Sequence, residues 1–141
     1  MNRKVILKES RKWATKLGFK NIHFRIYPEN PFLYGCAQKV KNGHRISFYG
    51  IKRRDFEAVL FHELGHIKYN HCRFIGTDSK QEYQAEKYAL KILSEYMPSK
   101  FKERIRLLRN CVRDIFWRMQ YPDHTTATKK VLSEYRRNKH E

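Results

Sequence analysis

Residues 59–69 read VLFHELGHIKY and lie within a helical pattern that we expect to run over about residues 53–71. His62 and His66 are four residues apart, so their side chains share one face of the helix. Zinc favours nitrogen ligands and tolerates an open fourth position, where Glu63 can act as general base on a water molecule. The alternative is that two histidines and a glutamate fall at this spacing by chance on an ordinary amphipathic helix. H-E-x-x-H thus predicts a catalytic metal-binding helix, whose candidate core contacts are Phe56, Val59, Leu60, Leu64 and Ile67.

A third metal ligand is expected on the next helix, predicted over about residues 79–96. This helix begins SKQEYQAEKYALKIL, and Glu82 lies sixteen residues beyond His66. If the two helices are antiparallel, Glu82 can reach the metal. Glu86, one turn further along the same face, can then accept a hydrogen bond from a ligand imidazole. The alternative for Glu82 is a capping box with Ser79, since S-x-x-E is typical of a helix start.

With both motifs present, the sequence resembles the gluzincin metallopeptidases, in which HExxH is followed by a glutamate ligand in an E-x-x-A-(D/E/N) setting. Here that setting is EYQAE, residues 82–86. The order of elements is similar to the ImmA/IrrE group and the minigluzincins, and to the soluble core of HtpX-like peptidases. The resemblance covers roughly residues 1–98. It implies a zinc-dependent metalloendopeptidase that hydrolyses a protein or peptide substrate, with Glu63 as catalytic base and Zn²⁺ held by His62, His66 and Glu82.

A metzincin arrangement is the competing interpretation of the same helix, because Cys72 sits where HExxHxxGxxH has its third ligand. The glycine that such a turn requires is absent, and Tyr69 stands in its place. His71 is one residue out of register and should point away from the other histidines if the helix continues. We therefore assign His71 and Cys72 to the helix end or to core packing.

The preceding residues predict one helix and three strands. The helix is expected over 3–17, and a half-buried strand over 20–27, where apolar and polar residues alternate. Two further strand-like runs, 33–40 and 44–49, flank Asn42-Gly43, a dipeptide that favours a tight hairpin turn.

These elements predict an α+β fold. We expect a small, largely antiparallel sheet with a hairpin, packed against the active-site helix and the second ligand-bearing helix, with further helices at the C-terminus. A strand at the sheet edge, most plausibly within residues 44–49, could bind an extended substrate through backbone hydrogen bonds.

The chain divides into a minimal zinc-peptidase core, residues 1–98, and a helical C-terminal extension of the same domain, residues 99–141. Residues 121–124 interrupt the extension, and a short helix is expected over 125–137. Before the interruption, apolar residues recur at spacings of three and four, which predicts one face of a single long helix formed by Phe101, Ile105, Leu108, Val112, Ile115 and Met119.

We hypothesise that this extension restrains access to the cleft, because its apolar face must pack against a small core. His124 or Asp123 could approach the open metal position, although surface positions in a turn are the simpler interpretation. A second donor to the reacting carbonyl oxygen is also needed, and Tyr121, His124 and Tyr69 are candidates.

Thirty-one Lys and Arg against fourteen Asp and Glu give a formal net charge of +17. Such a charge favours non-specific contact with nucleic acid. No paired-Cys/His finger or aromatic RNP stretch accompanies it. The alternative function is therefore a basic nucleic-acid-associated or regulatory module with a structural zinc site. Structural zinc normally has four protein ligands, whereas this sequence offers three, which favours catalysis.

The sequence contains no run of about 18 uncharged apolar residues, as a membrane-spanning helix requires, and its first residues are too charged for a signal peptide. We expect a soluble, cytoplasmic monomer. Three widely spaced cysteines, Cys36, Cys72 and Cys111, indicate free thiols rather than a disulfide framework.

Overall fold

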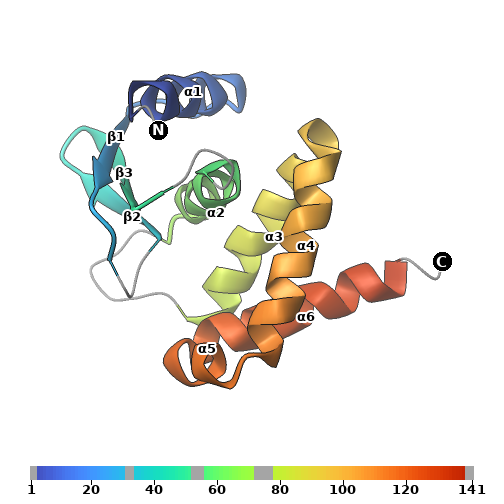
Figure 1. Ribbon diagram of the computed structural model, residues 1–141. Helices are drawn as coiled ribbons and strands as arrows, with labels where there is room; N and C mark the ends of the chain where they lie inside the picture. The colour runs from blue at the N-terminus through green and yellow to red at the C-terminus, as the bar shows by residue number, and fades with distance from the viewer. Residues whose placement is uncertain (1–2, 31–33, 52–55, 72–77, 139–141) are drawn as a thin grey trace.

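The computed structural model of the chain describes residues 3–30, 34–51, 56–71 and 78–138. In Figure 1 the sheet and α1 lie on one side, α3 to α6 on the other, and α2 between them. No described helix is both long and apolar enough to cross a lipid bilayer. The predicted α+β class is confirmed, and the elements are α1 (Arg3–Lys16), β1 (Ile22–Tyr27), β2 (Gly35–Val40), β3 (Gly43–Tyr49), α2 (Phe56–Lys68), α3 (Ser79–Tyr96), α4 (Pro98–Arg113), α5 (Ile115–Gln120) and α6 (Pro122–Asn138).

The three-stranded sheet has the order β1-β3-β2 and is mixed. The predicted hairpin between β2 and β3 is confirmed, and these two strands are antiparallel. β1, however, pairs in parallel with β3, so the sheet is less antiparallel than the sequence predicted. The reason lies in burial: β3 carries the fully buried Ile46 and Phe48, which favours the central position for this strand.

The central position of β3 corrects the expectation about a substrate-binding edge. Residues 44–49 are paired on both sides and cannot accept a further strand. Among the described strands, the free edges belong to β1 and β2. β2 also runs close beside α2, because a Cβ added at Gly35 would lie 2.6 Å from Val59 Cγ1 and 3.3 Å from Glu63 Cγ.

Two apolar clusters hold the elements together. The larger one joins the sheet to α1, α2 and α3, and includes Phe56, Leu60 and Leu64 among the predicted contacts of α2. Val59 and Ile67 pack at its border. The second cluster binds α4 and α6 to the opposite side of α3 through Leu90, Ile105, Leu108, Val131 and Leu132.

The prediction of a single long helix after Pro98 is wrong, because α4 ends at Arg113 and Asp114 separates it from α5. The Asp114 side chain caps α5 by accepting hydrogen bonds from the backbone N–H groups of Phe116 and Trp117. Ile115 and Met119 consequently leave the expected packing face and are 57% and 75% exposed.

The next helix also begins earlier than predicted. α6 starts at Pro122, which suits the first position of a helix, so Asp123 and His124 lie in its first turn rather than in an interruption.

α2 and α3 approach each other closely at two small residues, Gly65 and Ala85. A Cβ added at Gly65 would lie 2.9 Å from both the Cα and the carbonyl oxygen of Ala85. The glycine of HELGH and the alanine of EYQAE therefore allow the two backbones to come close, and the histidines lie within reach of Glu82 as a result.

We predict that Gly65→Ala destabilises the chain. Alanine normally favours a helix over glycine by about 1 kcal/mol, so an unhindered site would gain stability. Here the added methyl meets backbone atoms that cannot turn away, and we expect a net loss of about 1–3 kcal/mol in the free energy of unfolding. Denaturant unfolding measures it. A stabilised variant would contradict the close helix contact.

Candidate metal centre

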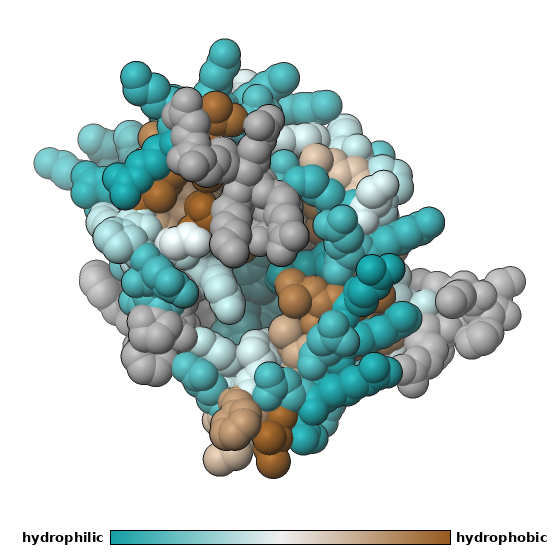
Figure 2. Space-filling view, viewed as in Figure 1, coloured by the Kyte–Doolittle hydropathy of each residue, from teal (hydrophilic) through white to brown (hydrophobic). Residues whose placement is uncertain are grey.

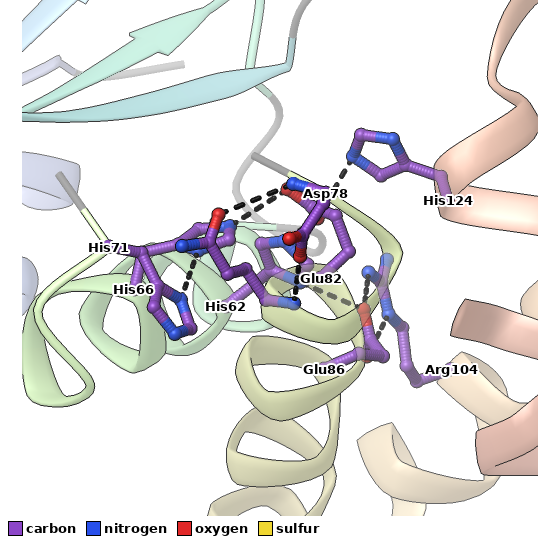
Figure 3. A network of polar contacts seen from close by, with 9 residues as sticks. His62, His66, His71, Asp78, Glu82, Glu86, Arg104 and His124 are labelled. Atoms are coloured by element: carbon purple, nitrogen blue, oxygen red, sulfur yellow. Dashed lines mark hydrogen bonds and ion pairs between the residues drawn. The ribbon is translucent and has the colours of Figure 1, made fainter. Parts of the chain in front are cut away.

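Three side chains of the chain converge on one point between α2 and α3 (Figure 3). His62 Nε2 lies 2.9 Å from Glu82 Oε2, and His66 Nε2 lies 3.1 Å from Glu82 Oε1. One ligand atom from each of the three residues lies within 4.8 Å of the others. The predicted His-His-Glu group is therefore assembled, and it could hold a metal ion.

Glu82 is available for this role because another residue caps α3. Asp78 is the N-cap, and it forms a reciprocal capping box with Gln81. The alternative of a capping box between Ser79 and Glu82 is therefore wrong. Glu82 lies in the first turn, one turn before Ala85, and its carboxylate faces α2.

The electrostatics of this group favour a carboxylate in contact with cations. Glu82 is only 3% exposed. Burial alone would raise its pKa, but hydrogen bonds to His124, His62 and His66 hold the pKa of Glu82 well below its ordinary value. Burial lowers the pKa of His62, yet its contacts with Glu82 and Glu86 raise it well above the usual value. A metal ion at this point would take the place of the protons that now link imidazole to carboxylate.

Glu63 differs from the other buried carboxylates. It is 7% exposed, and its carboxylate makes no hydrogen bond or ion pair with any residue that the structure describes. Burial raises the pKa of Glu63, and the nearby His62 and His66 oppose this rise. A buried carboxylate with a raised pKa and no partner is well suited to accept a proton.

Glu86 supports His62 from the side away from Glu82. His62 Nδ1 lies 3.0 Å from Glu86 Oε1, so the expected hydrogen bond between this carboxylate and a ligand imidazole is present. Glu86 in turn accepts hydrogen bonds from Arg104 of α4, at 2.6 Å from Nη2 and 3.1 Å from Nε. Burial raises the pKa of Glu86, but Arg104 and His62 together hold it far below its ordinary value.

Arg104 was not singled out from the sequence, although a signal was present. It sits next to Ile105 and three residues after Phe101, on the stripe of α4 that packs inward. An arginine at such a position needs a buried carboxylate as partner. Periodicity alone could not say which carboxylate that is.

The assignment of His71 to the helix end is confirmed, and because the helix does not continue through it, its side chain turns towards His66. Asn70 has a φ of +59°, and the His71 N–H donates to the His66 carbonyl at 2.8 Å, which ends the helix in a Schellman motif. The two Nδ1 atoms of His66 and His71 consequently lie 3.1 Å apart, and His71 Nε2 lies 2.8 Å from Gln84 Oε1. His71 thus fixes the ring of His66. Cys72 lies outside the described residues.

His124 is the predicted donor candidate that reaches the centre. Its Nε2 lies 3.0 Å from Glu82 Oε2, and its ring stacks near that of His62 with centroids 6.5 Å apart. The ring of Tyr121 packs edge-on against the ring of His124, with the two centroids 5.7 Å apart, and so borders the centre through His124. Tyr69 instead stacks on His71.

Comparison of the chain with models of known protein families, with curated proteins and with solved structures finds no match.

We predict that a divalent metal ion stabilises the chain through this centre. Binding to the folded state alone adds about 2.7 kcal/mol at an ion concentration one hundred times the Kd. Glu82→Ala should lose most of this gain, measured as the rise in melting temperature over chelator-treated protein. His44→Ala, in β3, is the matched control and should keep the gain. Equal stabilisation of both variants would contradict the site.

Proposed function

We propose that the chain is a zinc-dependent metalloendopeptidase that cleaves peptide bonds of a protein substrate. One observation supports this most: the residue Glu63 is buried, its carboxylate has no hydrogen-bond or ion-pair partner among the described residues, and it adjoins two imidazoles that converge on the Glu82 carboxylate. A purely structural centre would have no use for such a carboxylate.

The donor set fits zinc in type and in spacing. Two imidazole nitrogens and one carboxylate oxygen are common ligands of catalytic zinc, with a fourth position left open. With bonds of about 2.0–2.1 Å, neighbouring ligand atoms of a tetrahedral site stand about 3.3–3.4 Å apart. The two histidines contact different oxygens of Glu82, at 2.9 and 3.1 Å, and one ligand atom from each of the three residues lies within 4.8 Å of the others, so the side chains need to shift only modestly to surround an ion.

In this proposal, a zinc ion held by His62, His66 and Glu82 would supply Lewis-acid chemistry, which would polarise the scissile carbonyl and increase the acidity of a water molecule. Glu63 takes a proton from that water and passes it to the leaving amine. Glu86 and Arg104 keep the imidazole of His62 in one orientation and one tautomer, while His71 does the same for His66.

His124 supports the reacting carbonyl oxygen. It approaches from α6, on the other side of Glu82 from α2, so its Nε2 can donate a hydrogen bond as negative charge develops on that oxygen.

The substrate would lie along β2. This strand has a free edge among the described strands, and its first residue, Gly35, lies directly over Glu63. An extended peptide could pair with that edge through backbone hydrogen bonds. The face of the molecule in Figure 2 is hollowed near its centre, with hydrophilic residues in the hollow, which suits a peptide backbone.

Glu63→Gln should abolish peptide hydrolysis while metal content and melting temperature stay close to those of the wild type. The amide keeps the shape of the side chain but cannot accept the proton. Cleavage of an unfolded protein, followed by gel electrophoresis and mass spectrometry, measures the effect. Turnover equal to that of the wild type would exclude Glu63 as the base.

His124→Ala should lower kcat by about 10²–10³-fold, as loss of a donor to the developing oxyanion does, without removing the metal. Asp123→Ala changes an exposed neighbour in the same helical turn and is the control.

His124→Ala also tests the hypothesis that the C-terminal extension restrains access of the substrate to the cleft. Faster cleavage by His124→Ala would support that restraint and contradict the role as a donor. A point variant is better than truncation after residue 121, because truncation would also remove the buried residues Val131 and Leu132 of the second cluster.

A further inference from the structure

One face of the sheet is turned away from the apolar core and from the metal centre. In β1, Ile22, Phe24 and Ile26 pack against the core, so the alternating residues His23, Arg25 and Tyr27 belong to the opposite face. We refer to this opposite side of β1, β2 and β3 as the outer face. The register places Arg45 beside His23, and Gln38 on the other side of Arg45.

A pocket of about 530 Å³ lies beside β1, where it borders the outer face. Four basic side chains from three segments line it, Arg11 of α1, His23 and Arg25 of β1, and Arg45 of β3, together with the apolar Ile22, Phe24 and Val40. None of its described lining residues is acidic. Among the residues that the structure describes, no carboxylate pairs with Arg11, Arg25 or Arg45. The pocket is therefore an uncompensated positive site.

Arg45 has hydrogen-bonding capacity that the protein leaves unused. Its Nη2 donates to Gln38 Oε1 at 2.9 Å, while its Nε is buried and has no partner among the described residues. A buried donor without an acceptor costs about 1–3 kcal/mol. An anionic oxygen in the pocket would accept from this guanidinium with a charge-assisted hydrogen bond.

One end of the outer face is aromatic. Tyr27 and Tyr49 are paired across the two parallel strands, and their rings stack with centroids 5.4 Å apart and an interplanar angle of 19°. Tyr27 lies on the edge strand, and Tyr49 is its one ring contact among the described residues. The second side of the Tyr27 ring is therefore not covered by another ring.

From this arrangement we infer that the outer face of the sheet binds single-stranded nucleic acid, with phosphates in the basic pocket and a base stacked on Tyr27. Proteins that bind single strands without strict sequence preference combine a positive groove with aromatic rings. His23, Arg25 and Tyr27 alternate along one strand, so they follow each other at intervals of about 6.6 Å. A single nucleic-acid strand that runs along β1 can contact them in turn.

The charge of the whole chain favours nucleic acid over a small anion. Residues 1–49, which supply α1 and the sheet, contain eleven Lys and Arg but two acidic residues, Glu9 and Glu29. This excess extends far beyond a single phosphate site. None of the residues that line the pocket belongs to the centre proposed for peptide hydrolysis, so this inference does not depend on the proposed activity.

The test uses the full chain and a fluorescently labelled oligouridylate, with affinity measured by fluorescence anisotropy over a range of salt concentrations. Arg11→Gln and Arg25→Gln remove charges that have no partner in the structure, so the fold should survive. Each should weaken binding and reduce the slope of log affinity against log salt by about 1. Tyr27→Leu should weaken binding about tenfold, through loss of a stacked base.

Two exposed lysines of the C-terminal helices, Lys102 and Lys129, provide matched controls as Lys102→Gln and Lys129→Gln. Both should bind the oligonucleotide like the wild type, and so should Glu63→Gln, which separates this site from the proposed catalysis. Equal weakening by the control and pocket variants would show diffuse attraction and overturn the inference. Unchanged binding by Tyr27→Leu, or displacement of the oligonucleotide by inorganic phosphate at constant ionic strength, would overturn it as well.

Discussion

The contact between Gly65 and Ala85 is the constraint on which the rest of the site depends. α2 carries two of the three candidate ligands and α3 carries the third, and a single methyl group at residue 65 would meet the backbone of α3 at 2.9 Å. The small residues within HELGH and EYQAE are thus part of the packing and not of the chemistry. They set the distance at which one carboxylate can contact two imidazoles, and the buried leucines of α2 then hold the crossing in place.

The second constraint is the balance of buried charge. Glu63, Glu82 and Glu86 are all buried within a short distance along two helices, and isolated buried carboxylates are costly. Glu82 is compensated by three imidazoles, and Glu86 by His62 and the Arg104 guanidinium. Glu63 alone has no such partner among the described residues. The protein therefore stabilises two of its carboxylates as anions and leaves the third with a raised pKa, so three carboxylates of one kind differ in charge because their surroundings differ.

The sequence was sufficient for features that local pattern determines. The bounds of α3, the hairpin, and the convergence of His62, His66 and Glu82 followed from periodicity, turn chemistry and spacing. Features set by tertiary partners were not accessible in this way. The parallel pairing of β1 depends on which strand takes the centre of the sheet, and Arg104 depends on a helix crossing far along the chain. The break at Asp114 was hidden because the apolar spacing continues across it, although an aspartate is a common N-cap. Asn70 was a local signal for the turn that places His71, and it was overlooked.

The order of these parts along the chain has a consequence for biosynthesis. A polypeptide leaves the ribosome N-terminus first, so the sheet and the HELGH helix emerge before α3, and α3 emerges before α4 and α6. Until α4 has emerged, Glu86 lacks the Arg104 guanidinium, and until α6 follows, Glu82 lacks the third of its imidazole contacts. The three candidate ligands are therefore synthesised before the residues that support them, and the contacts of Arg104 and His124 form only after α4 and α6 have been synthesised and have docked.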